Sequence, residues 1–181
     1  MKATLFSFLI IAGFYFSAAA QTSDSKYTVS LGPAYYLPIF KTAEVNAGSM
    51  AASIQGSYRL SSKLQATGSA GVVSVAVAKL YKELWEPWYA TSYKNTIFFP
   101  VKGGLKYYVA DRFYAAAEAG AAVAKESYSS TSFAYAGGIG TTLKISGNSA
   151  LDISAKYETW ALNVNSTSTF LGLRVAYAFG F

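Results

Sequence analysis

The chain has 181 residues, of which 52% are hydrophobic, 17% are aromatic and only 13% are charged. A soluble domain carries roughly 25% charged residues, so this composition argues against an ordinary soluble protein. Cysteine and histidine are both absent, which excludes disulfides, thiolate metal sites and the commonest general base. The net charge of +6 is spread along the chain, so we expect no nucleic-acid partner, and we expect no cofactor.

The first twenty residues have the three parts of a secretory signal peptide. Lys2 provides a basic start, residues 4–16 are apolar, and the small residues that follow include Ala18 and Ala20 in an Ala-x-Ala arrangement. We predict that residues 1–20 are removed by cleavage after Ala20 and that residues 21–181 form one domain. An uncleaved anchor helix is the alternative, but the apolar segment is shorter than the roughly 20 residues that a membrane helix needs.

The mature chain alternates between large apolar residues and small or polar residues, which indicates strands with two unlike faces. We predict eight strands, at residues 26–38, 49–60, 64–74, 95–109, 113–124, 133–145, 150–160 and 169–181. The connections alternate between long ones, at residues 39–48, 75–94, 125–132 and 161–168, and turns of three or four residues. No segment has helical period along these strands, so the pattern predicts an all-β, antiparallel, up-and-down barrel with eight strands.

The polar face of these strands distinguishes between two kinds of eight-stranded barrel. A soluble barrel of the lipocalin type would turn its apolar face inward around a ligand and would carry many Lys and Glu residues outside. Here the polar face consists mainly of Gly, Ala, Ser and Thr, which suits the narrow interior of an eight-stranded barrel. We therefore predict a transmembrane barrel with the apolar face outward, closed because lipid leaves no partner for a free sheet edge.

The small face also carries charges, and a charge in a narrow interior must be paired. The expected cross-strand neighbours are Glu118 with Lys102 and Lys106, Lys144 with Asp152, Glu158 with Arg174, and Arg59 with Gln65. The predicted interior network comprises Arg59, Lys102, Lys106, Glu118, Lys144, Asp152, Lys156, Glu158 and Arg174. Such a network acts either as a path for ions or as a polar plug that closes the barrel.

Aromatic residues gather in two places. Near the predicted strand ends they are expected to form an interfacial belt, with a carbohydrate-binding strip as the alternative. The longest connection holds a second group, Tyr81, Trp85, Trp88, Tyr89 and Tyr93. Residue spacing there predicts a short helix that ends before Pro87. These aromatic side chains provide either a contact surface for an extracellular protein or glycan, or a rim at the lipid headgroups.

The closing strand, TFLGLRVAYAFGF, ends on an aromatic residue and alternates apolar side chains at Leu173, Val175, Tyr177, Phe179 and Phe181. It resembles the closing strand of Gram-negative outer-membrane β-barrels, in which this pattern is the signal for the insertion machinery. The hairpin at residues 98–120, FFPVKGGLKYYVADRFYAAAEAG, is similar to the central hairpin of small barrels of the OmpA/OmpX type. The resemblance implies an integral outer-membrane monomer in contact with lipid and lipopolysaccharide, with long loops outside and both mature termini in the periplasm.

That family is functionally mixed, so the resemblance implies little about activity. We expect a non-catalytic protein with an envelope-structural or surface-contact role through its long loops, especially residues 75–94. A narrow pore for small ions or solutes is the first alternative. A lipid-modifying barrel enzyme is the second, and it is disfavoured because histidine is absent and the interior acids have basic neighbours.

Overall fold

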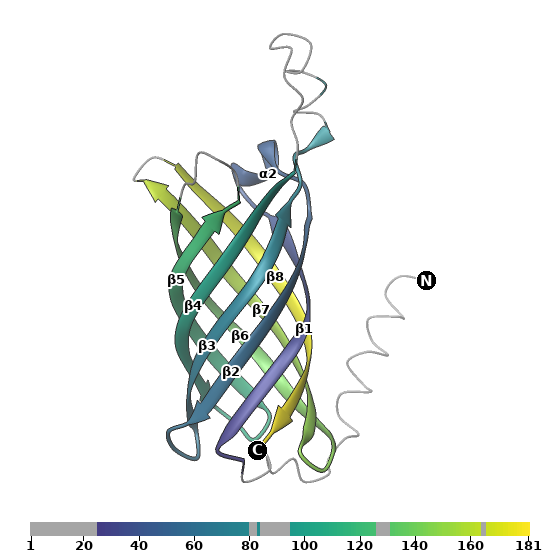
Figure 1. Cartoon of the computed structure of the whole chain (residues 1–181), viewed down its shortest axis with the longest axis vertical. Helices are drawn as coiled ribbons and strands as arrows, with labels where there is room; N and C mark the ends of the chain where they lie inside the picture. The colour runs from purple at the N-terminus through teal and green to yellow at the C-terminus, as the bar shows by residue number, and fades with distance from the viewer. Residues whose placement is uncertain (1–24, 80–82, 84–94, 126–130, 164–165) are drawn as a thin grey trace.

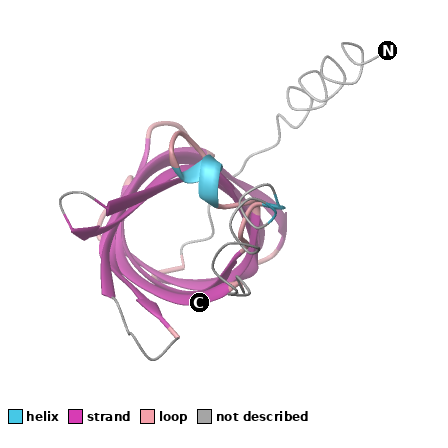
Figure 2. Ribbon diagram, turned by 90° about the horizontal axis from the view of Figure 1, so that it is seen from above, coloured by secondary structure: helices cyan, strands magenta, loops and turns pink. Residues whose placement is uncertain are grey.

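The computed structural model describes residues 25–79, 83, 95–125, 131–163 and 166–181. Its strands are β1 (Tyr27–Pro38), β2 (Ser49–Arg59), β3 (Leu64–Val75), β4 (Thr96–Tyr108), β5 (Phe113–Ala124), β6 (Thr131–Ser146), β7 (Ser149–Asn163) and β8 (Ser166–Gly180). Each strand pairs antiparallel with the next, and β8 pairs with β1, so the sheet closes into a barrel (Figures 1 and 2). The predicted fold class is confirmed. The predicted signal peptide lies outside the described residues.

Three short turns lie at the same end of the barrel as the C-terminus (Figure 1). In the first of them the Ser61 hydroxyl accepts a hydrogen bond of 3.1 Å from the backbone N–H of Leu64. In the third, Gly147 has a φ of 50°, a left-handed conformation that glycine adopts at little cost. We call this end of the barrel the turn end and the opposite one the loop end.

The connection at residues 39–48 was predicted to be a loop, but it contains a one-turn helix, α2 (Thr42–Val45). Figure 2 shows α2 at the rim of the barrel. The Thr42 hydroxyl accepts a hydrogen bond of 2.8 Å from the backbone N–H of Thr169 on β8, and Asn46 forms an isolated bridge with Val77. The first connection is therefore fastened to the rim at two places.

The hairpin of β7 and β8 is longer than predicted. Residues 161–168 were predicted to be a loop, yet the ladder continues to the pair Asn163 and Ser166. The prediction was wrong because the polar residues there do not mark the end of the strand. A strand that has left the apolar zone still needs partners for its backbone groups, and polar side chains do not prevent that pairing.

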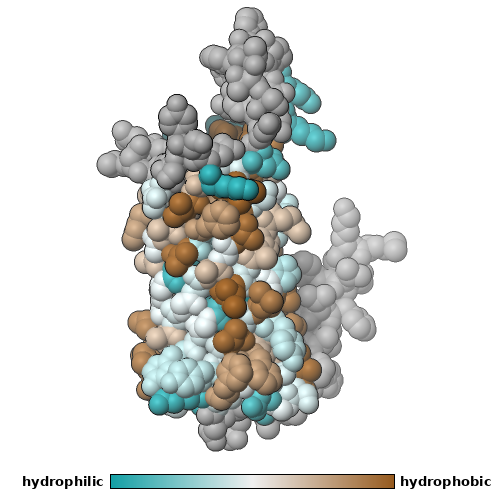
Figure 3. Space-filling model, viewed as in Figure 1, coloured by the Kyte–Doolittle hydropathy of each residue, from teal (hydrophilic) through white to brown (hydrophobic). Residues whose placement is uncertain are grey.

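The outer wall carries the large apolar side chains, as the alternation predicts. Leu31, Met50 and Ile139 are 62%, 65% and 68% exposed, and Figure 3 shows apolar residues over the height of the visible wall. Large apolar side chains that remain exposed would be unfavourable in water. This wall therefore suits the hydrocarbon interior of a membrane. Among the residues that the structure describes, no helix is both long and apolar enough to cross a membrane.

Two prolines interrupt the ladder. The pairing of β1 with β8 passes from Leu31 directly to Ala34, and that of β3 with β4 passes from Ala70 to Val73, opposite Pro100. Proline has no N–H group to donate to a neighbouring strand. Pro33 and Pro100 therefore each leave a short stretch of weakened pairing in the wall.

Candidate functional site: the interior of the barrel

The middle of the barrel interior is filled by charged side chains from four strands. Because side chains alternate along a strand, even-numbered residues of β4, β5, β7 and β8 all point inward. The charged residues that meet there are Lys102, Lys106, Glu118, Asp152, Lys156, Glu158 and Arg174. All except Lys156 are buried, and the Lys156 side chain is only 15% exposed. We call these seven residues the charge layer.

Two lysines and two glutamates form the part of the charge layer nearer to the loop end. The Lys102 Nζ atom lies 2.6 Å from Glu158 Oε2 and 3.5 Å from Glu118 Oε2. The Lys156 Nζ atom lies 2.5 Å from Glu118 Oε1, which also accepts a hydrogen bond of 3.1 Å from the Gln55 amide. The pairing of Glu118 with Lys102 agrees with the sequence prediction, whereas the expected contact with Lys106 does not form.

Asp152 is the centre of the part nearer to the turn end. Its Oδ2 atom lies 2.8 Å from Lys106 Nζ, and its Oδ1 atom accepts a hydrogen bond of 2.8 Å from the Tyr114 hydroxyl. The guanidinium of Arg174 approaches the same Oδ1 atom at 3.6 Å. The Lys106 ammonium also lies 4.1 Å from the centre of the Tyr114 ring, a favourable arrangement for a cation.

Arg174 does not face Glu158, so that predicted pair is wrong. In the observed register Ser154 lies opposite Arg174, and Phe170 lies opposite Glu158. The observed register differs by four residues from one that would place Glu158 opposite Arg174. Arg174 instead donates hydrogen bonds to the hydroxyls of Ser53, at 2.8 Å, and Ser30, at 3.0 Å.

The predicted pairing of Lys144 with Asp152 is also wrong. Thr142 lies opposite Asp152, and Lys144, which is exposed, lies opposite Ala150. The observed register differs by two residues from the predicted one, and an irregularity between Lys144 and Ser146 changes it by one residue at the turn. Arg59 lies opposite Gln65 as expected. Arg59, Lys144, Lys106 and Asp152 line a hollow of about 60 Å³ at the turn end.

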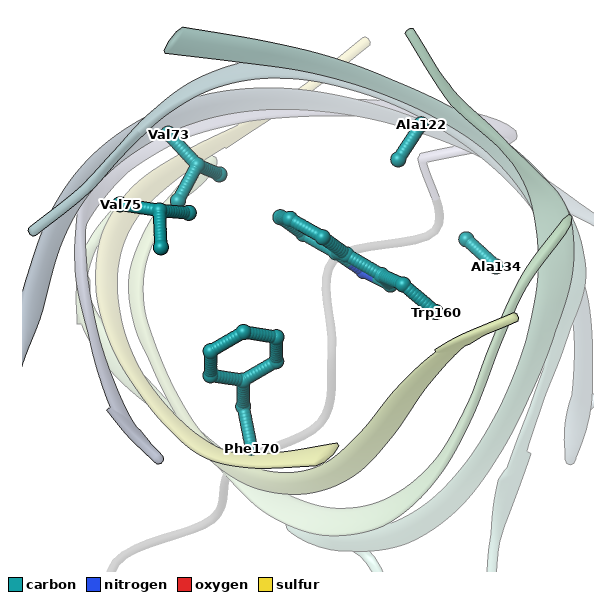
Figure 4. Close-up of a cluster of buried hydrophobic side chains, with 6 residues drawn as sticks. All are labelled: Val73, Val75, Ala122, Ala134, Trp160 and Phe170. Atoms are coloured by element: carbon teal, nitrogen blue, oxygen red, sulfur yellow. The ribbon is translucent and has the colours of Figure 1, made fainter. Parts of the chain in front are cut away.

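A second layer, which sequence reasoning missed, lies across the lumen at the loop end. Its buried side chains are Val73, Val75, Ala122, Ala134, Trp160 and Phe170, with Tyr36, Ala51 and Phe98 packed against them. Figure 4 shows the Trp160 ring reaching into the middle of the lumen, with the other five labelled side chains around it. We call this set the aromatic layer. Its signal in the sequence was the inward position of Trp160 and Phe170 in the period of two.

The rings of the aromatic layer are in direct contact. The centre of the Trp160 ring lies 5.1 Å from that of Phe170 and 5.0 Å from that of Phe98. The Tyr36 ring meets Phe170 edge to face at 6.0 Å. Aromatic pairs at these separations are favourable, by about 0.5–1.5 kcal/mol each beyond their area burial.

Glu158 connects the two layers. Its Oε1 atom accepts a hydrogen bond of 2.7 Å from the Trp160 indole N–H. Its Oε2 atom accepts one of 3.2 Å from the Tyr36 hydroxyl and one of 2.6 Å from Lys102. With a side chain that is 1% exposed, Glu158 therefore fixes two rings of the aromatic layer to a cation of the charge layer.

The arrangement is suited to obstruction rather than to catalysis. The carboxylates of Glu118, Asp152 and Glu158 are each held by at least one lysine, so none of them is placed as an isolated acid or base. Within the described ranges, no group of three or more acidic side chains could hold a metal ion. A hollow of about 40 Å³ beside Glu118 and Arg174 leaves room for water.

We compared the sequence and the structure with those of known proteins. The sequence matches no family model and no curated protein. Among solved structures, Neisserial surface protein A superposes with a TM-score of 0.62 at 14% identity, covering 87% of this chain and 98% of that protein. Ail, the attachment invasion locus protein of Yersinia pestis, gives 0.55 at 14% identity, with 86% and 99% covered.

The outer membrane protein OprG of Pseudomonas aeruginosa gives a TM-score of 0.55 at 13% identity, with 91% of this chain and 99% of OprG covered. The chain has the fold of the small eight-stranded outer-membrane β-barrels. At these identities the likeness concerns the fold alone. The comparison agrees with the closed ladder and the outward apolar wall described above.

In this outer-membrane barrel fold the predicted assembly signal lies on the outer wall. Leu173, Val175, Tyr177, Phe179 and Phe181 are between 42% and 63% exposed. The backbone N–H of Phe181 donates a hydrogen bond of 2.8 Å to the carbonyl of Tyr27, so the last residue is held against the start of β1. Their role as a signal stays a prediction.

The predicted aromatic belt lies on the outer wall, exposed except at half-buried Tyr58, and much of it lies toward the turn end. The residues of the predicted belt are Tyr27, Tyr35, Tyr58, Tyr107, Phe113, Tyr157, Tyr177, Phe179 and Phe181. The rings of Tyr27 and Tyr58 lie 5.2 Å apart, and those of Phe179 and Phe181 lie 5.0 Å apart. The possible contact residues Tyr81, Trp85, Trp88, Tyr89 and Tyr93 lie outside the described residues.

Proposed function

We propose that this chain is an integral, non-catalytic protein of the outer membrane whose barrel is closed to solutes and supports its outer loops for surface contact. The single observation that carries the proposal is the stacking of the aromatic layer on the charge layer across the lumen. Trp160 and Glu158 link the layers directly. A barrel with this interior serves as a rigid scaffold for its outer loops and not as a pore.

The wall supports the location in the membrane. Large apolar side chains cover its outside, and the chain closes on itself without a free edge, as a barrel in hydrocarbon requires. Both described chain ends lie at the turn end (Figure 1). We place the turn end in the periplasm and the loop end outside the cell. In outer-membrane barrels the short turns lie on the periplasmic side and the long loops on the extracellular side.

Closure distinguishes this function from that of a narrow pore. The purified protein, reconstituted in a planar bilayer, is expected to give no steady current, because ions meet a packed aromatic layer before they reach the charge layer. A general porin reconstituted in the same way provides the positive control for incorporation. Steady ohmic conductance of the unaltered protein would overturn the closed-barrel proposal.

The proposed partners follow from the two surfaces. The apolar wall contacts membrane lipid and lipopolysaccharide, the closing strand contacts the insertion machinery during assembly, and the barrel acts as a monomer. For the loop end we propose an extracellular protein or glycan. Lys41 and Lys79 are exposed there, and Ail has been solved in complex with the heparin analogue sucrose octasulfate, which supports a polyanionic glycan as the first ligand to test.

A further inference from the structure

The charge layer holds more positive than negative charge. Among the residues that the structure describes, its members are four basic and three acidic side chains: Lys102, Lys106, Lys156, Arg174, Glu118, Asp152 and Glu158. Four positive and three negative charges leave a net charge of +1 in the middle of the barrel. Because a buried charge without a partner is costly, this excess favours a bound counter-ion.

Arg174 is the basic residue of the charge layer that is held least closely by a carboxylate. The ammonium groups of Lys102, Lys106 and Lys156 each lie within 2.8 Å of a carboxylate oxygen. The Arg174 guanidinium lies 3.6 Å from Asp152, and Lys106 lies 2.8 Å from the same carboxylate. The excess positive charge therefore belongs to Arg174, whose guanidinium does not lose its proton in proteins.

The hydrogen bonds of Arg174 also leave room for an anion. Its Nε and Nη2 atoms donate to neutral oxygen atoms, the Ser53 hydroxyl and the hydroxyl and carbonyl of Ser30. Its Nη1 atom has no hydrogen-bond acceptor in the described part of the chain, although the residue is only 7% exposed. A buried donor of this kind normally has an acceptor, and for a cationic donor an anion is the stronger one.

The hollow of about 40 Å³ beside Arg174 provides the space. We call it the central hollow. Its charged lining residues are Lys102, Lys156, Arg174 and Glu118, so three positive charges face one negative charge, and Glu118 is already held by Lys156. Uncharged donors line it as well, namely Ser53, Ser69 and Gln55. Since one water needs about 10–15 Å³, the central hollow has room for a small ion together with water.

The turn end provides a positively charged approach to the central hollow. The turn-end hollow of about 60 Å³ is lined by Arg59, Lys106 and Lys144, with Asp152 as its acidic residue. An anion that arrives from the turn end therefore meets mostly positive side chains before it meets Arg174. The aromatic layer lies between the loop end and the charge layer, so we expect the ion to enter and leave through the turn end.

We propose that the central hollow binds one small monovalent anion of the size of chloride, between Arg174 and Lys156. The ion neutralises the charge layer and supplies the acceptor that the Arg174 Nη1 atom lacks. The small volume excludes organic anions, and a divalent anion would replace one excess positive charge by one excess negative charge. This site goes beyond the closed-barrel function and does not depend on whether the lumen conducts.

The test measures how chloride affects the stability of the full-length mature barrel in detergent micelles. Sodium chloride replaces sodium gluconate, whose anion is too large for the central hollow, at constant ionic strength and pH. An ion that binds only the folded state lowers the ratio of unfolded to folded protein about tenfold at ten times its Kd. The urea midpoint of the unaltered barrel is therefore expected to rise as chloride replaces gluconate.

Three variants separate the bound ion from a general effect of salt. Arg174→Met removes the excess charge and should lose the response to chloride, whereas Arg174→Lys keeps the charge and should retain it. Lys63→Gln removes an exposed charge that does not line the central hollow, and it should respond as the unaltered barrel does. Heat-modifiable migration on gels verifies folding, and Lys156→Met, which also neutralises the charge layer, is used if Arg174→Met does not fold.

A bromide salt locates the ion directly. Crystals of the barrel grown with sodium bromide are expected to show an anomalous scattering peak beside the Arg174 Nη1 atom. Bromide peaks on the outer surface alone would overturn the proposal, and so would a folded charge-neutralised variant that responds to chloride as the unaltered barrel does.

An unaltered barrel whose midpoint does not respond to chloride would also overturn the proposal, because water alone would then fill the central hollow. A barrel that conducts but still responds to chloride through Arg174 would contradict the closed-barrel function alone. Failures of the two proposals are therefore distinguishable.

Discussion

At the scale of single residues, Glu158 connects more side chains of the barrel interior than a single ion pair would. Its carboxylate accepts hydrogen bonds from Trp160, Tyr36 and Lys102, and these three donors come from β7, β1 and β4. A buried ion of this kind is tolerated because it is both paired and hydrogen-bonded. Loss of its charge would affect both layers at once.

Glu158→Gln is therefore expected to lower the free energy of unfolding by about 3 kcal/mol, since it leaves the Lys102 ammonium buried without its shorter ion pair. Urea unfolding in lipid vesicles, followed by tryptophan fluorescence, measures this change. Adding Lys102→Met should recover part of the loss. Exposed Glu44→Gln on α2 is the control, expected to stay within about 0.5 kcal/mol, and equal midpoints for Glu158→Gln and this control would contradict the assigned role.

The sequence predicted which charged residues point into the barrel more successfully than it predicted which of them contact each other. The period of two alone assigned Glu118, Asp152 and Arg174 to the inside. Their partners depended on register, and a register is shifted by every residue that joins or leaves a hairpin. Lys144 and Arg174 were assigned wrong partners because alternation does not reveal register: the observed pairing differs from the predicted one by two residues at Lys144 and by four at Arg174.

At the scale of the elements, β6 shows how a strand adapts to its two sides. A side chain at Gly140 would collide with the ring and hydroxyl of Tyr114 and would come within 2.8 Å of the Ile153 carbonyl. Gly137 points to the other side and has nothing within 4 Å of the same position. The first glycine makes room for the Tyr114 side chain that binds Asp152.

Gly140→Ala should consequently reduce stability by about 1–3 kcal/mol through overpacking. Gly137→Ala is the matched variant on the same strand and should be neutral or slightly stabilising, because alanine restricts the unfolded chain. Urea midpoints in vesicles compare the two. A result in which both alanines behave alike would show that Tyr114 can move without cost.

The closing strand β8 gives a prediction about assembly. Phe181→Ala is expected to lower several-fold the amount of protein that reaches the outer membrane, because it removes the terminal aromatic side chain of the predicted assembly signal. Immunoblotting of outer-membrane fractions measures the effect. Phe113→Ala, which removes another exposed aromatic residue at the turn end, is the control, and normal levels of Phe181→Ala would show that β8 is only a strand.

The elements themselves were predictable because one face of every strand had to be apolar. Phe113–Ala124 was predicted to the residue, and each of the eight strands was found. The ends of β6, β7 and β8 were not, since polar residues outside the apolar zone pair as readily as those inside it. The short helix α2 was missed because four residues are too few to show a helical period.

At the scale of the whole molecule, the barrel and its longest connection are separable. Strands β3 and β4 are paired at both of their ends, from Leu64 with Tyr107 to Val75 with Thr96. Removal of residues 80–90 should therefore leave a barrel that still migrates faster on gels before heating than after. The same variant should bind heparin-coated beads more weakly than the unaltered protein, because it lacks four of the five possible contact residues, Tyr81, Trp85, Trp88 and Tyr89.

Loss of heat-modifiable migration in this deletion would contradict the independence of the barrel. Unchanged binding by a folded deletion variant would remove the surface-contact role of this connection. Lys41→Gln and Lys79→Gln, which retain the connection but remove exposed positive charge, distinguish aromatic contact from charge attraction. Salt should weaken the second kind of binding more than the first.

The break in pairing at Pro33 has a consequence for how the barrel forms and opens. Seven of the eight strand pairs are hairpins of consecutive strands and can zip locally, but β1 and β8 are brought together only from opposite ends of the chain. Closure across such a sequence separation carries the largest entropic cost, and this seam also lacks the N–H of one residue. We expect the β1–β8 seam to close last and open first, so that its amide protons exchange ahead of those between β5 and β6.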